Sequence, residues 1–592
     1  MNEHSLVEYT VTLDPARHQL LVKMRIPNLP AGELRLQSPT WVPGDYSFAN
    51  YGRDIFACSA SDATNGAVLA LRRDGLADYT VQHGGGELLV SYRAAASSAD
   101  FSEACGVLGD QNGVLLGTRY LRVAGTNGPC LVNYEVPAGW PIHHPSGARQ
   151  VGERSWEYTD YEQLLDTPVC FGRFDLITRN VRGTDFHHLF LTRGVGFDEG
   201  VEGFVDDLVK IADDYFTVFG SFPFADYTYV LSLNPGDGWG LEHLSASMVG
   251  LDPSTFYDTD QYKVSVRVCA HELFHAWNVR RLRPSPLDNL AHALETGSFT
   301  DGLWVAEGFT RYYEFLSCTR TGVYSPGQFF SAVTSYYLHL AALPAYQCVS
   351  PADSSSASYL NHDKYPGRAN SAIDYYDAGM VIAFELDAIL RSETGGQSLD
   401  SMFAAFYQRY AGQGAGYTIK DICAFAGDLV PGLGRRLWEK ATQPARLELP
   451  AQLAKLGFKV IEQGVSYLGV IMQGDVGPAL YSVLDNTPAG ASGLAAEDVV
   501  CAVNGYPYSI EAIQQAGAHG REVVLDVMRG NQPHRYTIEP GQRTVIGELV
   551  WEGCAQQASL IAAWLGATFA PARGQVFALD FYENFHGVET VV

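Results

Sequence analysis

The run Ala270-His271-Glu272-Leu273-Phe274-His275-Ala276-Trp277 decides what the middle of this 592-residue protein can be. If the run is helical, His271 and His275 lie one turn apart on the same face, where two imidazole nitrogens can converge on one Zn²⁺. Glu272 then stands beside the open position of the metal as a general base. The run therefore predicts the core of a metallopeptidase.

The sequence on either side of this run supplies a helix and a third ligand. Residues 262–269 reach the first histidine without Gly or Pro, and Pro284 and Pro286 are expected to end the helix. Residues 303–316 read as a second helix that contains Glu307. A carboxylate on a neighbouring helix would complete a two-His, one-Glu site and leave the fourth position for water. We therefore expect one Zn²⁺ per protein molecule, with the ligands His271, His275 and Glu307.

These motifs resemble a known family. The His-Glu-x-x-His-x-Trp run, followed by Trp-x-x-Glu-Gly-x-Thr-x-Tyr, is similar to the gluzincin peptidases. The gap between His275 and Glu307 is longer than in aminopeptidase N relatives. That gap, the continuation Trp277–Arg281 and the earlier segment Gly238–His243 resemble the glycyl aminopeptidase family, whose members carry a PDZ domain near the C-terminus. The resemblance implies a zinc aminopeptidase that prefers small N-terminal residues such as Gly or Ala.

The resemblance also assigns residues to the substrate. In gluzincin aminopeptidases a Gly-x-x-Glu segment lies along the cleft, and its carboxylate holds the free α-ammonium of the substrate. This places substrate binding on Glu242 and Gly240, although Gly238 stands one residue further from Glu242 than in that pattern. The structural alternative is that Glu242 caps a turn. For His243, substrate binding, orientation of Glu242 and a purely structural role all stay open.

A tyrosine is the candidate for stabilising the oxyanion of a tetrahedral intermediate. The segment Asp374–Gly379 resembles the Tyr-Glu-x-Gly segment that carries the catalytic tyrosine in aminopeptidase N relatives. That alignment favours Tyr376, with Tyr375 as the fallback. A phenol hydroxyl near the metal donates to the developing negative charge, whereas the alternative is a core tyrosine at a helix start. The relatives have Glu-Lys where this protein has Asp377-Ala378, which weakens the match.

Composition and charge exclude several classes of function. The net charge is −26, from 66 acidic and 40 basic side chains, which argues against nucleic acid or an anionic membrane as partner. The first residues lack the basic and apolar regions of a signal peptide, and no run of about 18 apolar residues predicts a membrane span. The ten cysteines are scattered without a Cys-x-x-Cys pair. We expect a cytoplasmic protein, with the periplasm not excluded.

The sequence reads as that of a multidomain protein. Residues 1–175 alternate as strands of a β-sandwich, residues 176–455 are expected to form a mainly α, thermolysin-like catalytic domain, and residues 456–545 resemble a PDZ-like α/β domain. The tail, residues 546–592, is aromatic and is expected to dock on another domain. The loop Pro39–Tyr46 resembles a family signature and is read as structural.

Three functions remain on these grounds. The leading one is an aminopeptidase acting on peptides with a free N-terminus. The second is an endopeptidase that uses the same zinc centre. The third is a scaffold whose PDZ-like domain binds a peptide or the C-terminal end of a polypeptide while the metal site is idle.

Overall fold

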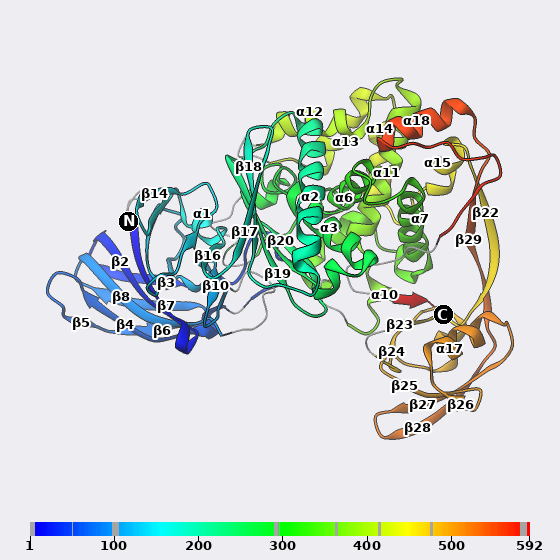
Figure 1. Ribbon diagram of the computed structural model, residues 1–592. Helices are drawn as coiled ribbons and strands as arrows, with labels where there is room; N and C mark the ends of the chain where they lie inside the picture. Colours follow the sequence, from blue (N-terminus) through cyan, green and yellow to red (C-terminus); the bar gives the residue numbers. More distant parts are fainter. Residues whose placement is uncertain are drawn as a thin grey trace. The chain divides into compact units, whose positions relative to one another are not determined.

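The computed structural model of the protein describes residues 6–49, 51–97, 106–288, 294, 297–361, 365–411, 416–473, 477–579 and 589–591. The protein forms two compact units. Unit 1 comprises Met1–Ser298 with Tyr410–Gly416, and unit 2 comprises Phe299–Arg409 with Tyr417–Val592 (Figure 1). His586, which the sequence leaves without a role, lies outside the described residues.

The N-terminal part of unit 1 is rich in sheet, as its alternating sequence predicts. In β2 the apolar residues Val22, Met24 and Ile26 are buried and the charged residues between them are exposed. The largest sheet has the order β14 (Arg149–Gly152), β15 (Ser155–Tyr158), β12 (Cys130–Glu135), β1 (Val7–Asp14), β2 (Gln19–Leu29), β8 (Gly86–Ala95), β4 (Ile55–Asp62), β5 (Val68–Leu69). Two four-stranded sheets have the orders β13 (Ile142–His143), β16 (Val169–Gly172), β10 (Asn112–Leu115), β9 (Val107–Leu108) and β11 (Arg122–Val123), β3 (Gly32–Gln37), β7 (Asp78–His83), β6 (Leu71–Arg73).

The rest of unit 1 is a five-stranded sheet with two long helices. The sheet has the order β17 (Asp175–Val181), β18 (Thr184–Phe190), β19 (Asp226–Leu233), β21 (Ala246–Leu251), β20 (Gly238–Glu242). Helix α2 (Phe197–Phe219) buries an apolar stripe, and α3 (Thr259–Phe274) contacts β20 and β21 (Figure 1). A short helix, α1 (Tyr161–Leu165), precedes the sheet. The sheet thus carries Glu242 on the strand beside the helix that carries the two histidines.

Helix α3 ends earlier than its sequence predicts. The sequence favours a stop at Pro284 and Pro286, but the last helical residue is Phe274 and His275 is the C-cap. The backbone then turns through irregular bonds, such as the one from the Arg280 amide to the His275 carbonyl at 2.9 Å. The second histidine therefore stands at the end of the helix, where its ring is held by the turn that follows.

Unit 2 begins with a group of helices packed through glycines. Glu307 lies at the junction of α5 (Leu303–Ala306) and α6 (Gly308–Arg320), rather than inside one helix as expected. A Cβ atom on Gly308 would stand 2.3 Å from the Cα of Gly379, so the two backbones touch where α6 crosses α11. The remaining helices are α7 (Pro326–Ala342), α8 (Pro351–Ser356), α9 (Ser358–Asn361), α10 (Arg368–Ser371), α11 (Tyr375–Glu393), α12 (Leu399–Tyr410), α13 (Ile419–Leu429), α14 (Leu433–Thr442) and α15 (Leu449–Lys455).

The C-terminal part of unit 2 returns to sheet. A long pair, β22 (Phe458–Tyr467) and β29 (Gly541–Trp551), continues into β30 (Val576–Phe577). Between them lies a small core around two sheets, with the orders β24 (Leu480–Val483), β23 (Val470–Gln473), β31 (Glu589–Val591) and β26 (Tyr506–Pro507), β25 (Val499–Val503), β27 (Val523–Arg529), β28 (Gln532–Ile538). The helices here are α16 (Pro488–Ser492) and α17 (Ile510–Ala518). The predicted Asn504-Gly505 hairpin turn is present, with both residues at positive φ.

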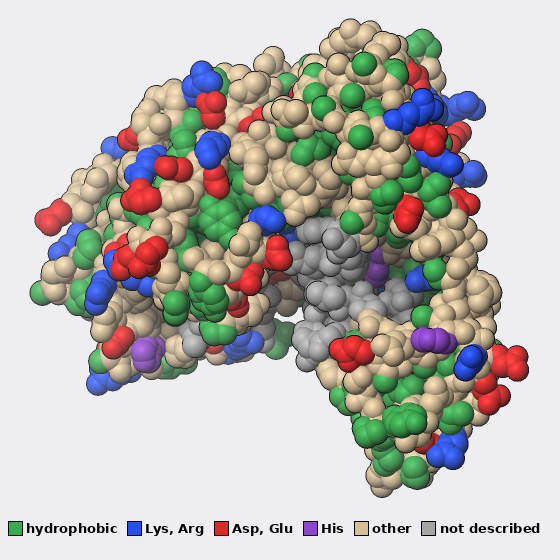
Figure 2. All heavy atoms as spheres, turned by 45° about the vertical axis from the view of Figure 1, so that its right-hand side comes forward, with side chains coloured by type: hydrophobic (Ala, Val, Ile, Leu, Met, Phe, Trp, Pro, Cys, Tyr) green, Lys and Arg blue, Asp and Glu red, His purple; other side chains and the backbone are tan. Residues whose placement is uncertain are grey.

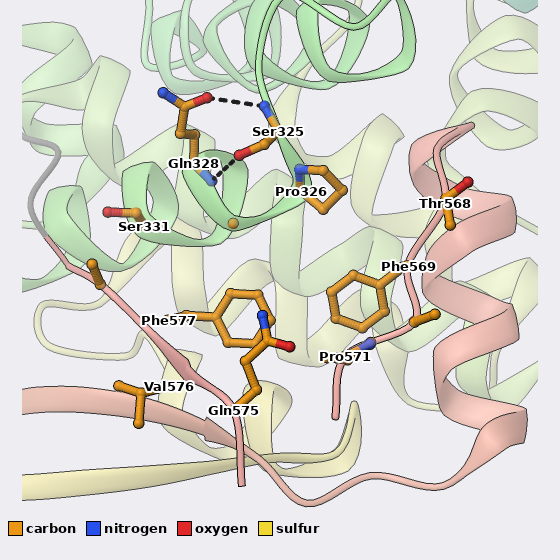
Figure 3. A pocket seen from close by; sticks show the side chains of 13 residues that line it. Ser325, Pro326, Gln328, Ser331, Thr568, Phe569, Pro571, Gln575, Val576 and Phe577 are labelled. Carbon is orange, nitrogen blue, oxygen red and sulfur yellow. Dashed lines mark hydrogen bonds between the residues drawn. The ribbon is translucent and has the colours of Figure 1, made fainter. Parts of the chain in front are cut away.

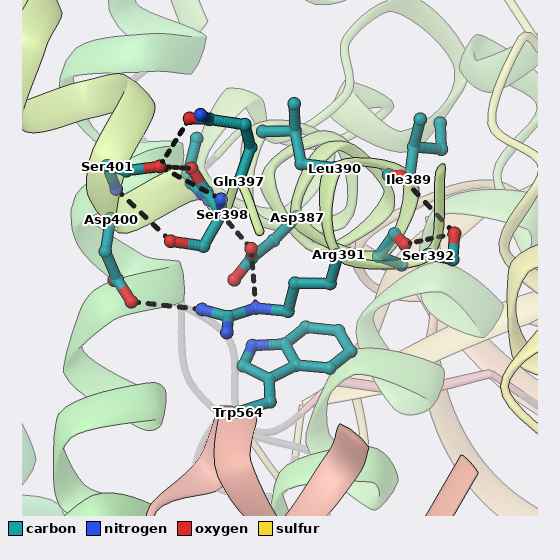
Figure 4. Close-up of polar contacts among 12 residues, drawn as sticks. Asp387, Ile389, Leu390, Arg391, Ser392, Gln397, Ser398, Asp400, Ser401 and Trp564 are labelled. Atoms are coloured by element: carbon teal, nitrogen blue, oxygen red, sulfur yellow. Dashed lines mark hydrogen bonds and ion pairs between the residues drawn. The ribbon is translucent and has the colours of Figure 1, made fainter. Parts of the chain in front are cut away.

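Aromatic side chains hold the tail helix α18 (Ala555–Leu565) in unit 2. Trp564 is buried under the guanidinium of Arg391, which bonds Asp387 and Asp400 (Figure 4). The indole N–H of Trp564 donates to the hydroxyl of Tyr312 at 2.9 Å. Farther along, residues 568–571, residues 575–578 and the start of α7 line a groove in which Phe569 and Phe577 stack (Figure 3).

The surface and the cysteines fit the composition. On the face drawn in Figure 2, acidic and basic side chains are interspersed rather than gathered into a basic patch. No disulfide joins the cysteines that the structure describes. Of the helices in the described ranges, none has the length and apolar character that crossing a membrane would require.

Candidate metal centre and substrate site

The two histidines of α3 converge as their spacing predicts. Asp258 starts the helix by accepting the amides of Asp260 and Gln261, each at 2.9 Å. One turn apart at the other end, the rings of His271 and His275 have their Nε2 atoms 2.9 Å from each other. Two ring nitrogens at this separation form a ready pair of metal ligands.

The tautomer of His275 suits a metal. Its Nδ1 lies 2.7 Å from the carbonyl oxygen of Asn278, in the turn that follows the helix. Since a carbonyl only accepts, Nδ1 carries the hydrogen and Nε2 keeps its lone pair. A backbone partner of this kind is the usual outer support of a zinc-binding histidine. The residues present therefore fit Zn²⁺.

Glu272 is packed against the edge strand β20. Its side chain is 4% exposed, and a carboxylate oxygen lies within 4.8 Å of ligand atoms of Glu242 and His275. A Cβ atom on Gly240 would stand 2.3 Å from Oε1 of Glu272, which no real contact allows. Gly240 therefore leaves the space that this carboxylate occupies. The sequence predicted substrate binding for Gly240, and the structure places it against the proposed base.

Glu242 is a buried carboxylate at the end of β20. It is 4% exposed, and within the described parts of the protein its Oε1 has no hydrogen-bond partner. The N-terminal loop covers it, since a Cβ atom on Gly44 would lie 2.8 and 2.9 Å from its two oxygens. Burying an acceptor without a partner costs free energy, so this carboxylate is suited to bind a cationic group or a hydrogen-bond donor.

A buried ion cluster next to Glu242 was not predicted from the sequence. Asp166 accepts the Leu244 amide at 2.7 Å and lies 3.1 Å from Nδ1 of His243 and 2.9 Å from the guanidinium of Arg280. Burial raises the pKa of Asp166. Arg280, His243 and the Leu244 amide together lower it by more than burial raises it, so the pKa of Asp166 lies below its usual value. These residues are far apart in sequence, and no spacing signals their contact.

The other predicted site residues lie in unit 2. Glu307 is 2% exposed. Tyr375 and Tyr376 are both buried with their rings stacked at 5.0 Å, and the guanidinium of Arg311 lies 4.8 Å from the Tyr376 ring. Burial, and next the Glu307 carboxylate, raise the pKa of both phenols. Each tyrosine therefore keeps its proton and is able to donate it in a hydrogen bond, and the geometry does not separate the two candidates.

Comparison with known proteins identifies the family. Residues 264–382 match the M61 glycyl aminopeptidase model, and residues 8–173 match the model of the peptidase M61 N-terminal domain. Over these two stretches the chain is similar to M61 glycyl aminopeptidases. The predicted family is thus confirmed, and with it a zinc metallopeptidase as the class of enzyme. No curated protein matches the sequence.

One solved structure shares the fold of this chain, and a second is less similar. An aminopeptidase N family protein from Idiomarina loihiensis has a TM-score of 0.83 at 19% identity, over 95% of this chain and 100% of that one. An M1 zinc metallopeptidase from Deinococcus radiodurans has a TM-score of 0.47 at 14% identity, over 75% and 96%. The first likeness supports a sheet-rich N-terminal domain followed by a helical catalytic domain.

Proposed function

We propose that this M61 peptidase is a zinc-dependent aminopeptidase that removes a small N-terminal residue, Gly or Ala, from peptides. The observation that carries the proposal is the buried carboxylate of Glu242, whose Oε1 has no hydrogen-bond partner among the described residues and which lies within 4.8 Å of the Glu272 and His275 ligand atoms. A free α-ammonium would satisfy that oxygen by a charge-assisted hydrogen bond. The description of the matched family, glycyl aminopeptidase, supports a small N-terminal residue such as Gly.

One Zn²⁺ per protein molecule is proposed to bind two imidazoles and one carboxylate, those of His271, His275 and Glu307. The fixed tautomer of His275 and the closeness of the two Nε2 atoms support this donor set. When bound, Zn²⁺ would lower the pKa of a water molecule and polarise the scissile carbonyl.

Three side chains are proposed to carry out the remaining steps of the reaction. Glu272 accepts the proton of the attacking water and passes it to the leaving amine. Glu242 holds the substrate's amino terminus, which fixes the first peptide bond beside Glu272. Tyr376 donates its phenol hydrogen to the developing oxyanion. Comparing Tyr376→Phe with Tyr375→Phe tests this assignment. Replacing the catalytic tyrosine should lower kcat by about a hundredfold, whereas replacing its neighbour should leave kcat unchanged.

Residues 456–545 are proposed to form a PDZ-like domain, supported by the small core around β23 to β28 and α17. A cytoplasmic location is proposed as well, because no disulfide joins the described cysteines in spite of their number.

An endopeptidase with the same metal centre is the main alternative. The zinc-loaded protein should hydrolyse Gly- and Ala-arylamides, and Glu272→Gln should retain one zinc per molecule but lose at least about a hundredfold in kcat. A zinc-loaded parent that cleaves internal bonds of blocked peptides, and leaves free-amine substrates intact, would establish the endopeptidase instead.

A further inference from the structure

One strand of the PDZ-like unit is paired with a segment from the far end of the sequence. The sheet β24–β23–β31 places β31 antiparallel to β23, with Ile471 opposite Val591, Met472 opposite Thr590 and Gln473 opposite Glu589 (Figure 1, where β31 is red). Without β31, the backbone groups along this side of β23 would form an open sheet edge. A short, distant segment thus completes a strand of the small core.

The side chains of Val470, Ile471 and Met472 in β23 are buried on both faces of the strand. Val470 and Met472 point into the small core with Leu468 and Ile513, whereas Ile471 packs with Leu343 of the helical region. A strand buried on both faces is held in place and can recognise a new partner only through its backbone edge.

The other edge of the sheet is closed. Asn370 of α10 donates to the Val483 carbonyl and accepts the Asp485 amide, each at 2.9 Å, at the end of β24. Leu480 of β24 also exchanges backbone hydrogen bonds with Glu497 and Asp498, at 2.8 and 2.9 Å. Within the described residues of this sheet, these bonds leave the side of β23 that faces β31 for strand addition.

The direction of β31 matches a peptide-binding site. Because the pairing is antiparallel, β31 runs toward the start of β23, where the Leu468-Gly469 loop lies. The loop is rigid: its two carbonyls accept the amides of Ala489 and Leu484 at 2.8 Å, and Gly469 at positive φ leaves no room for a Cβ atom beside Thr487. An extended segment that runs toward such a loop is typical of strand-addition sites.

We propose that residues 589–591 act in cis as a competing ligand for the peptide-binding edge of β23 in the PDZ-like unit. The proposal deepens the PDZ-like assignment above and does not depend on the peptidase activity. A tethered segment acts at an effective concentration of the order of millimolar, so it excludes weak peptides without preventing exchange by stronger ones.

The test uses the full-length protein and a shortened protein that ends at residue 588. The probe is a peptide with the sequence of residues 586–592 whose amino group carries fluorescein, which also protects it from an aminopeptidase. Fluorescence anisotropy should show saturable binding to the shortened protein, and at least about tenfold weaker binding to the full-length protein. Hydrogen exchange should be faster at the amides of β23 in the shortened protein.

A pair of double variants in the full-length protein provides the matched control. Along a strand, successive amide N–H groups point alternately toward and away from the neighbouring strand. Thr590→Pro with Val591→Pro therefore removes at least one amide that donates a hydrogen bond to β23. This variant should bind the probe like the shortened protein. Thr590→Ala with Val591→Ala keeps both amides and should bind like the parent.

The outcomes separate the two proposals. Equal probe binding by the parent, the shortened protein and the proline variant, with unchanged exchange at β23, overturns cis occupancy but leaves a peptide site in the unit. No binding by any of them, with β23 amides equally protected throughout, overturns both the cis ligand and the peptide-binding role.

Discussion

Replacing Gly240 by Ala should disable the proposed base without touching a metal ligand. The new Cβ atom would stand 2.3 Å from Oε1 and Cγ of Glu272, whereas ordinary contacts are 3.4 Å or longer. The Glu272 side chain must therefore move by about 1 Å. A displacement of that size at a reacting group costs on the order of a hundredfold in rate, or about 2.7 kcal/mol of transition-state stabilisation.

The same strand offers the control. A Cβ atom on Gly238 meets nothing within 4 Å, so Gly238→Ala should keep the parental rate. The assay is steady-state hydrolysis of Gly-arylamide by zinc-loaded proteins, with zinc content and unfolding midpoint measured in parallel. We expect kcat to fall in Gly240→Ala alone, with zinc content unchanged. Parental kcat in Gly240→Ala, or equal losses in both variants, would refute the proposed placement of the base.

Two further changes test the surroundings of the site. Gly44→Ala would push on both oxygens of Glu242, so KM for Gly-arylamide should rise by about tenfold; Gly66→Ala, also at positive φ but with open space around it, should leave KM unchanged. Asp166→Asn removes the nearer of two carboxylates beside the buried guanidinium of Arg280, the other being Glu162 at 3.9 Å, and should cost about 3 kcal/mol, measured by urea unfolding; a loss below about 1 kcal/mol contradicts this. Because the folded pKa of Asp166 is depressed, its stabilisation is present above the unfolded pKa of about 3.9 and is lost as the pH falls through the folded value, so the variant should lose less stability than the parent below about pH 4.

Local patterns made much of the site predictable. The pairing of His271 with His275 follows from helix geometry, and the alternation of Val22, Met24 and Ile26 predicts a buried strand face. The early end of α3 was not predictable, because it depends on the bond between His275 and the Asn278 carbonyl in the folded turn.

Contacts between residues that are far apart in the sequence could not be predicted. Gly240 reads as part of a substrate-binding motif, and only the packing of β20 on α3 shows that it makes room for Glu272. Likewise, the pairing of Asp166 with Arg280 joins separate elements without any periodic signal. The pairing of β31 with β23 was not predictable for the same reason, because neighbouring strands are joined by backbone hydrogen bonds, which leave no side-chain pattern in the sequence.

The most direct test of the central claim compares Gly-arylamide with its N-acetyl derivative as substrates of the zinc-loaded protein. The proposed ion pair with Glu242 predicts hydrolysis of the free amine and a loss of at least about a hundredfold in kcat/KM on acetylation, since about 2.7 kcal/mol is within the range of a buried charge-assisted hydrogen bond. Glu242→Gln should remove most of that discrimination. Equal hydrolysis of the two substrates, or no hydrolysis of either by a protein that holds one zinc per molecule, would contradict the assignment as an aminopeptidase.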